Sequence, residues 1–387
     1  MSKALLLLFC LGGIVAEAQE IKLSPNTRVS VITCGPTQLE LYSAFGHSAI
    51  RVQDPANGID YAYNYGVFDF DQPNFYLNYT KGLLLFKLGV YPYSDFRDYY
   101  IYFNRSVTEQ YVDITQSQKQ KLFDFLEWNA KPENQTYRYD YFYNNCASKV
   151  RDVFRHVLRD SIQFDSTFIQ TKYTIRQLTD LYLTEQPWGD LGIDICLGLP
   201  IDKQAKPYEY MFLPDYIESS FDHATVLGKS GWKPAVIAKV PVYHHRPEPQ
   251  AFNWFHPWIV LGFLFAIAAV ISFIDWKRKK LSKWFDLIFF FVLGAVGVLL
   301  LLLWTMTDHR AAANNMNLLW ALPSHLIVLA IYSSKATAFI RKYFTFSMYL
   351  TAFLLAGWVL LPQQLNLFLI PVVGVALMRS ILLRRLI

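Results

Sequence analysis

The sequence has little charge, and its C-terminal third has almost no acidic residues. Charged residues make up 17% of the 387 residues, whereas hydrophobic residues make up 53%. From residue 257 to the end, the acids are Asp275, Asp286 and Asp308 alone. So much apolar surface excludes a single soluble globule, and the same composition excludes a disordered chain. The long apolar runs of this third predict membrane-spanning helices instead.

The positive charge of the chain belongs to the same apolar third. Residues 257–387 hold 12 basic and 3 acidic residues (+9), residues 19–256 hold 23 basic and 27 acidic residues (−4), and residues 1–18 are neutral, which together give the net charge of +5. The basic excess therefore belongs to the membrane part, and no nucleic acid is expected as a partner.

Two common catalytic motifs are missing as well. The sequence has no Gly-x-Ser-x-Gly, and beyond the pair His244 and His245 its histidines show no zinc-ligand spacing. A serine hydrolase and a zinc centre are therefore not indicated, and neither a metal nor another cofactor is expected.

The N-terminus is typical of a secretory signal peptide. Lys3 precedes the apolar run Ala4–Val15, and Ala16-Glu17-Ala18 forms a small-x-small cleavage site. The run is short for a bilayer span of about 20 residues, which favours cleavage after Ala18 over an uncleaved anchor helix. We therefore expect a signal peptide over residues 1–18, an exported domain over residues 19–256 and a membrane domain over residues 257–387.

Five apolar segments are expected to span the membrane. Lysine and arginine residues gather in alternate loops, at 277–283, 335–342 and 379–385, while the other loops between spans carry only Arg310. By the positive-inside rule, the C-terminus then lies in the cytoplasm. The segments are Pro257–Ile274, Phe285–Trp304, Leu318–Tyr332, Tyr343–Leu361 and Leu365–Met378.

The loop between the second and third segments carries polar side chains at the outer membrane surface. Asp308, His309, Asn314 and Asn317 are expected to hold a lipid headgroup there. An ordinary solvated loop is the alternative.

The exported domain alternates strand-like and helical patterns. Turn residues at 54–58 separate two strand-like runs and predict a hairpin. Ser117 with Gln120 has the pattern of a capping box and predicts the start of a helix. The expected strands are Val29–Thr33, Phe45–Val52, Tyr61–Phe70 and Val107–Ile114, and Tyr137–Tyr143 is expected to be a strand or extended.

Cys146 begins an amphipathic helix. Apolar residues at 150, 153, 154, 157 and 158 have helical spacing, and charged residues occupy the other face. Asn144 or Asn145 is expected to cap this helix, which places the sulfur against unpaired amide N–H groups and the positive end of the helix dipole. Such a position lowers a thiol pKa and predicts a nucleophile. Because the mature chain has three cysteines, Cys34, Cys146 and Cys196, at least one of them stays unpaired.

His47 is the expected base for this nucleophile. It lies among small residues in the run Phe45–Val52, where a helix N-terminus packed on the sheet can reach it. A turn centred on Pro55-Ala56 would set Asn64 opposite His47, whereas a turn centred on Asn57-Gly58 would set Phe68 there. The residue types leave this register open.

The order of these elements resembles a known superfamily. A histidine strand, a strand with a polar residue and a cysteine at a helix N-terminus are similar to the circularly permuted branch of the NlpC/P60 papain-like proteins, which includes the lecithin:retinol acyltransferase-like (LRAT-like) enzymes. The chain more closely resembles the Lnb lipoprotein N-acyltransferase family of Bacteroidetes, over nearly the whole mature length. The motifs are Phe45-Gly-His-Ser-Ala-Ile-Arg51, Tyr63-Asn-Tyr-Gly-Val-Phe-Asp69, Asn144-Asn-Cys-Ala-Ser148, and Asp308-His309 with Asn314 and Asn317.

The resemblance implies an α+β permuted papain-like domain in the periplasm, followed by an α-helical five-span domain in the bacterial inner membrane. It makes Cys146 the acylated nucleophile and His47 its base, with Asn64 as a third member by structural extension. A membrane phospholipid is the implied acyl donor, and a diacylated lipoprotein is the acceptor, through its α-amino group. With Cys146 free, Cys34 and Cys196 are then expected to form a disulfide.

Two other functions are compatible with the same residues. A membrane-tethered peptidoglycan endopeptidase or amidase would use the same Cys–His chemistry, but it does not account for five spans or for the polar outer loop. A non-catalytic membrane scaffold with a degenerate papain-like domain would not require His47 and Cys146 to meet.

Overall fold

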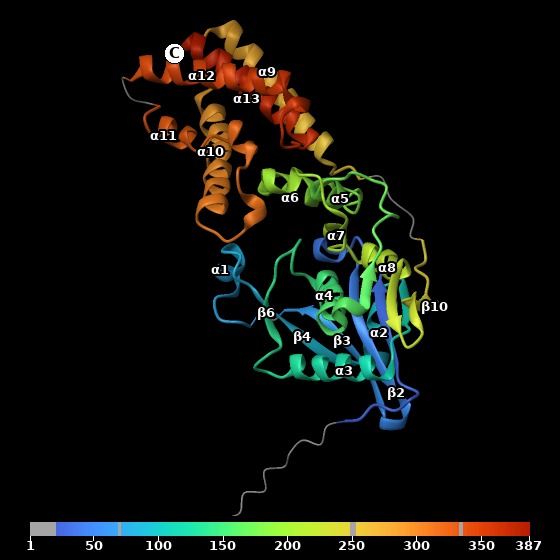
Figure 1. Cartoon of the computed structure of the whole chain (residues 1–387). Coiled ribbons are helices and arrows are strands. Elements are labelled where there is room, and N and C mark those ends of the chain that lie inside the picture. The colour runs from blue at the N-terminus through green and yellow to red at the C-terminus, as the bar shows by residue number, and fades with distance from the viewer. Residues whose placement is uncertain (1–20, 69–70, 248–252, 333–335) are drawn as a thin grey trace, which may run out of the picture.

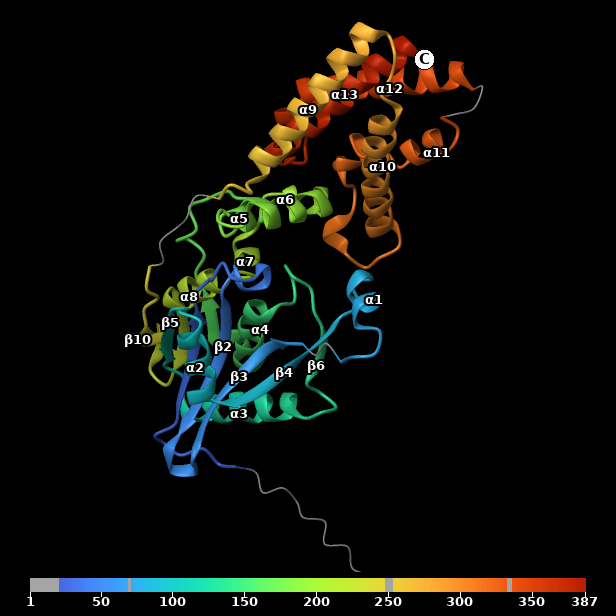
Figure 2. The same cartoon turned by 180° about the vertical axis from the view of Figure 1, so that it is seen from behind.

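A computed structural model of the chain describes residues 21–68, 71–247, 253–332 and 336–387. Figure 1 shows a sheet-rich N-terminal part joined to a helical C-terminal part, and Figure 2 shows the same arrangement from behind. The expected signal peptide lies outside the described residues, as does the end of the expected strand Tyr61–Phe70.

Seven antiparallel strands form the main sheet, in the order β10-β5-β1-β2-β3-β4-β6. In β2 the side chains alternate, so that Ile50 and Val52 face one side and Ala49 faces the other, and both sides are buried. The four expected strands are all found. The main-sheet strands are β1 Arg28–Cys34, β2 His47–Asp54, β3 Ile59–Val67, β4 Leu85–Pro92, β5 Val107–Val112, β6 Thr136–Arg138 and β10 Val236–Tyr243, and a second sheet holds β7 Ile162–Phe164, β8 Ala224–Gly228 and β9 Gly231–Pro234.

The β2–β3 hairpin is confirmed, but neither predicted turn is correct. Asp54 pairs with Ile59 across the short 3₁₀ turn Pro55–Asn57, and Gly58 follows with a φ of 65°. The turn is therefore centred between Ala56 and Asn57. This centre shifts the register by two residues from each of the two alternatives.

Helices cover both faces of the main sheet. Residues of α3 and α4 pack with Ile50 and Val52, and residues of α2 pack with Ala49 on the other face. The expected capping box at Ser117 is wrong, because Thr115 and Gln118 form the box that begins α3. The helices of this part are α1 Phe75–Thr80, α2 Tyr93–Tyr102, α3 Gln116–Ala130, α4 Cys146–Leu158, α5 Ile175–Asp180, α6 Pro187–Cys196, α7 Pro207–Tyr210 and α8 Pro214–Asp222.

The part that follows Pro257 is helical. Among the described residues, three helices are long and apolar enough to cross a membrane: α9, α10 and the helix from Leu367 to Leu386 that includes α13. The third expected span is not one long helix, because α11, which follows Pro323, has only 7 residues. The fourth lies in α12, whose 20 residues include Arg341 and Lys342. The helices are α9 Pro257–Arg278, α10 Lys283–Thr305, α11 Ser324–Ala330, α12 Thr337–Ala356 and α13 Ile370–Leu386.

Arg379 lies inside the helical part rather than in a loop. Its guanidinium is fully buried and donates to Asp286 at 2.7 and 2.9 Å and to Asp275 at 2.8 Å. The expectation that Arg379 marks a cytoplasmic loop is therefore wrong. Two of the three acids in this third of the chain neutralise a buried charge that joins α9, α10 and α13.

Within the residues that the structure describes, the sheet-rich part is bound to the helical part at two places. At the first, the segment from α6 through the 3₁₀ turn Leu199–Asp202 meets two loops of the helical part. Asn317 donates to the carbonyl groups of Asp194 and Ile195 at 3.0 and 3.2 Å, and Gln363 donates to that of Leu197 at 3.0 Å. The loops 306–323 and 357–366 therefore lie at the same end of the helical part.

The second place lies at α1. The Asp308 N–H donates to the carbonyl oxygen of Lys81 at 2.9 Å, and the Nε2 atom of His309 lies 3.1 Å from the carbonyl oxygen of Tyr79. Both views show α1 next to the end of α10 (Figures 1 and 2). The α1 segment is thus held against the loop that follows a candidate membrane span.

Candidate active site

Cys146 is the first residue of α4. Asn145 caps the helix, because its Oδ1 accepts from the Ser148 N–H at 2.8 Å while the Ser148 hydroxyl accepts from the Asn145 N–H at 2.8 Å. Apolar residues of α4, among them Val150 and Phe154, pack into the core beneath the sheet and hold the helix there. The sulfur therefore sits at the positive end of a fixed helix.

The imidazole of His47 reaches both Cys146 and Asn64. The sulfur forms a hydrogen bond with His47 and accepts from the backbone N–H groups of Ser48 and Ala147. The Nε2 atom of His47 lies 2.5 Å from the Oδ1 atom of Asn64. An amide oxygen only accepts, so Nε2 carries the hydrogen and Nδ1 is left to exchange a proton with the sulfur. The three predicted catalytic residues thus form one connected group.

The surroundings of Cys146 favour the thiolate. Burial raises the pKa of the Cys146 thiol, but the charge and hydrogen bond of His47, together with the Ser48 and Ala147 N–H groups, lower it by more, and its pKa falls below the usual value. At the other two cysteines burial has the largest effect, and it raises the thiol pKa of both Cys34 and Cys196. Cys146 is therefore the thiol suited to nucleophilic attack.

Gly66 makes room for the sulfur beside the imidazole. The β2–β3 pairing extends to Ile50 and Tyr63, and its continuation places Gly66 opposite His47. A Cβ atom on Gly66 would lie 3.4 Å from the Cβ of Cys146 and 3.9 Å from the Cε1 of His47. Its φ of 91° also suits glycine, and the β3–β4 register shifts at this point. The sheet therefore carries a local gap where the helix N-terminus meets the strand.

Aromatic side chains hold the other side of the imidazole. The His47 ring stacks on Tyr100, with centroids 5.9 Å apart and planes 17° apart, and Phe96 lies 6.4 Å away. Both aromatic residues come from α2 and are buried. Sequence reasoning missed Gly66 and Tyr100. Gly66 could have been found from the sequence, because a glycine two residues after Asn64 on the same strand is a usable signal, whereas nothing local points to Tyr100.

The expected disulfide between Cys34 and Cys196 is absent, and both are free thiols. Cys34 is fully buried in β1, where it pairs with His47 on one side and Val107 on the other. Cys196 ends α6, next to Ile195, whose carbonyl group accepts from loop residues of the helical part. The two cysteines thus belong to different elements of the fold.

The outer loop does not present its four predicted residues together for a headgroup. Asn317 is fully buried, and its amide bonds to α6 and to the Trp320 indole, so the expectation that it binds substrate is wrong. Asp308 forms an ion pair with Arg138, and His309 contacts Tyr79. Asn314 is exposed, with a φ of 52°. The loop mainly joins the two parts of the chain.

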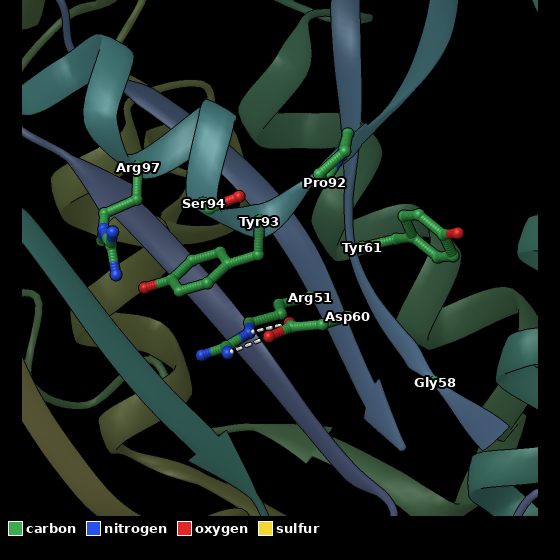
Figure 3. A pocket seen from close by; sticks show the side chains of 8 residues that line it. All are labelled: Arg51, Gly58, Asp60, Tyr61, Pro92, Tyr93, Ser94 and Arg97. Atoms are coloured by element: carbon green, nitrogen blue, oxygen red, sulfur yellow. Dashed lines mark hydrogen bonds and ion pairs between the residues drawn. The ribbon is translucent and has the colours of Figure 1, made fainter. Parts of the chain in front are cut away.

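A surface hollow near the β2–β3 turn lies away from these residues. Figure 3 shows Arg51 beneath the Tyr93 ring, with two dashed bonds to Asp60. The guanidinium lies 3.5 Å from the ring centroid, and Glu109 accepts from it at 2.9 and 3.0 Å. All three guanidinium nitrogens of Arg51 thus have hydrogen-bond partners within the fold. The hollow is therefore lined by residues whose contacts stabilise the fold.

Among the described residues, one cluster of three aspartates has the spacing of cation ligands. Oxygen atoms of Asp180, Asp190 and Asp194 lie within 4.8 Å of one another. Asn366 donates to Asp190 and Asp194 at 2.9 Å each, and Arg176 bonds to Asp194 at 2.5 Å. Asn366 and Arg176 thus already supply donors to Asp190 and Asp194, and the Asn366 bonds join these carboxylates to the helical part.

Comparison with known families matches both parts of the chain. Residues 17–180 match a family model described as the Lnb N-terminal periplasmic domain, and residues 248–387 match one described as the Lnb transmembrane domain. No curated protein and no solved structure matches the chain.

Proposed function

Because the chain belongs to the Lnb family, we propose that it is a lipoprotein N-acyltransferase that works through a thioester on Cys146. Family membership indicates a lipoprotein-modifying membrane enzyme with a periplasmic and a transmembrane domain. The observation that carries the finer proposal is the contact of the Cys146 sulfur with the His47 imidazole, which Asn64 holds in place.

In the first half-reaction, the Cys146 thiolate attacks an ester carbonyl of a membrane phospholipid. The carbon–sulfur bond forms, the ester carbon–oxygen bond breaks, and the His47 imidazolium protonates the departing oxygen. A lysophospholipid leaves, and the acyl chain stays on sulfur as a thioester. The N-terminal amide groups of α4 favour the negative charge that develops beside them.

In the second half-reaction, the neutral α-amino group of a diacylglyceryl-cysteine attacks the thioester. The carbon–nitrogen bond forms, and the thiolate leaves more readily than an alkoxide would. His47 takes the proton that the nitrogen loses, which returns the imidazolium–thiolate pair. The product is the triacylated lipoprotein, and no cofactor enters either step.

We further propose that the sheet-rich part is a permuted papain-like domain and that the helical part crosses the inner membrane five times, with the C-terminus in the cytoplasm. The chain order of His47, Asn64 and Cys146 supports the first point. For the second, α10 and α12 both end in loops on the side of the sheet-rich part, so the segment between them has to return across the membrane. Reporter fusions after residues 313, 336 and 362 test these crossings, because five spans place them outside, inside and outside, whereas three spans would leave all of them outside.

The test of the activity uses the full-length protein in phospholipid nanodiscs with a diacylated lipopeptide. Lysophospholipid and N-acyl peptide are expected, and intact mass should detect an acyl adduct on Cys146 before the peptide is added. Cys146→Ser is expected to abolish transfer, and His47→Ala to slow it by about 10²- to 10⁴-fold. Cys196→Ala is the matched control, since it removes a free thiol remote from His47 and should keep full activity.

The alternative functions predict different outcomes. Cleavage of cell-wall peptides without transfer would identify a peptidoglycan enzyme. If transfer persisted at the wild-type rate in Cys146→Ser, the thioester mechanism would be wrong. A protein that neither transfers nor cleaves, with Cys146 unmodified, would fit the scaffold alternative.

A further inference from the structure

We propose that the acyl chain bound to Cys146 lies along a row of aromatic rings, Tyr139, Phe86, Phe68, Phe75 and Tyr79, which we call the aromatic track. The track leads from the nucleophile to α1 and the end of a membrane span. This inference rests on the proposed function, since it names the binding site of the acyl group.

The rings of the aromatic track follow one another without a break. Tyr139 and Phe86 stack with centroids 4.1 Å apart, and Phe86 lies 5.4 Å from Phe68. Phe68 lies 6.5 Å from Phe75, which lies 6.4 Å from Tyr79. These residues come from three separated stretches of the sequence, so their alignment is a feature of the fold. Continuous ring surface suits a chain of methylene groups.

The inner end of the track lies at the nucleophile. Phe68 follows two residues after Gly66, whose missing side chain makes room for Cys146. Tyr139 precedes a loop whose ends, Asp140 and Asn144, pair with each other just before Cys146. Burial raises the pKa of Tyr139 most, and negative charge on Cys146 raises it further, as expected for neighbours. An acyl group on the sulfur therefore has apolar surface beside it.

The outer end lies at the helical part. Tyr79 accepts from His309 through its carbonyl oxygen, and Asp308 bonds to Lys81 and Arg138. These contacts place the end of the track a few residues beyond Thr305, where α10 ends. A lipid in the same membrane thus reaches the track without crossing open water.

Large apolar side chains are exposed around the outer end. Tyr76 is 77% exposed, Leu77 52% and Tyr79 60%, and Leu83 and Leu85 beyond α1 are also exposed. Exposed apolar groups in such a cluster mark an interaction site rather than ordinary surface. Because the cluster adjoins a membrane span and the far end of the track holds a thiolate, the occupant that fits both ends is the acyl chain of a membrane lipid.

Alkylation of Cys146 tests the track independently of transfer. Iodoacetamide and N-dodecyl iodoacetamide both react when the thiolate displaces iodide, and they differ in the chain that must be accommodated. In nanodiscs, we expect wild-type protein to favour the dodecyl probe, and Phe86→Trp to lower the ratio of dodecyl to short-probe rates by about tenfold. Trp128→Ala on α3, an exposed aromatic residue outside the track, should leave the ratio unchanged.

The rate ratio separates a blocked track from a damaged fold, because misfolding slows both probes together. If Phe86→Trp does not fold, Tyr79→Ala at an exposed position is the second variant. It is also expected to lower the ratio of dodecyl to short-probe rates. Equal ratios in wild type and variants would overturn the track even if lipopeptide transfer is normal. A ratio that falls as expected in a protein without transfer activity would support the track as a lipid site and refute the proposed reaction.

Discussion

The Nε2 atom of His47 lies 2.5 Å from the Oδ1 atom of Asn64, although the two residues are not opposite each other in the sheet. Continuing the β2–β3 pairing places Ala49 opposite Asn64 and Gly66 opposite His47, so the bond is diagonal. The position directly opposite His47 is therefore occupied by Gly66, which has no side chain. Cys146 enters from α4 at that position.

Replacing His47 with alanine should move the alkylation of Cys146 to higher pH. His47 lowers the pKa of the thiol through its charge and hydrogen bond, while burial raises it. Without the imidazole, burial dominates, the pKa rises, and less thiolate exists at neutral pH. Iodoacetamide labelling from pH 5 to 9, followed on the Cys146 peptide by mass spectrometry, measures this shift. An unchanged profile would show that His47 does not act on the sulfur.

Adding a methyl group at Gly66 should inactivate the enzyme, whereas the same change at Gly58 should not. Both glycines have positive φ, at 91° and 65°, so alanine costs about 1–2 kcal/mol of stability at either position. At Gly58 no atom lies within 4 Å of the new Cβ, but at Gly66 it meets Cys146 and His47. A displaced catalytic pair costs about 10²-fold in rate. Lipopeptide transfer and thermal unfolding of both variants measure this, and equal transfer rates would contradict the predicted crowding.

Removing the Asn317 side chain should destabilise the protein rather than weaken lipid binding. Alanine loses the bonds to two α6 carbonyl groups and leaves the buried Trp320 N–H unpaired, for a loss of about 2–4 kcal/mol. Asn314→Gly on the same loop is the control, because Asn314 is exposed and its φ of 52° suits glycine. Thermal unfolding in detergent measures the loss of stability, and the KM for phospholipid measures any loss of lipid binding. A raised KM in both variants, with normal stability, would restore the headgroup role expected from the sequence.

Replacing Asp180 with asparagine should stabilise the protein more at high pH than at low pH. Burial, then the charges of Asp194 and Asp190, raise the pKa of Asp180 to about 8. An unfolded aspartate has a pKa of about 3.9, so the folded state binds more protons and wild-type stability falls as pH rises from about 4 to 8. Asparagine has no charge at any of these pH values, so the variant does not lose stability in this way.

Unfolding temperatures at pH 5.5 and 8.5 measure the effect of Asp180→Asn. The gain over wild type should be larger at pH 8.5. Asp98→Asn, at an exposed ion pair with Arg97, is the charge control and should give the same difference at both values. A gain that does not depend on pH would mean that Asp180 is ionised throughout this range.

Local signals predicted that Cys146 begins a capped helix, because the residues that set this helix start lie within a few positions of it. The Asn145 cap and the apolar spacing after residue 150 belong to one helix, and both are confirmed. The contact with His47 was predicted because this histidine lies among small residues on a strand that the N-terminus of a packed helix can reach. Neither depended on knowing how distant strands pair.

The parts that the sequence did not predict depend on non-local geometry. The β2–β3 register is set by a four-residue turn, and moving its centre by one residue changes which side chain faces His47. The sequence could not predict where Cys196 lies, because α6 is held in place by loops more than a hundred residues later in the chain. Likewise, the pairing of Arg379 with Asp286 needs two helices to pack, so a count of loop charges misassigns it.

The two attachments of the sheet-rich part, at α6 and at α1, have a consequence for the acceptor. A domain fastened at one point can swing, but one fastened at two separated points keeps its height and tilt above the bilayer. In the proposed reaction, the thioester on Cys146 therefore stays at a fixed height above the membrane. If the acceptor is a lipoprotein, as proposed, it has to bring its own amine up to that height, so the residues that follow its lipidated cysteine are expected to govern how quickly it is acylated.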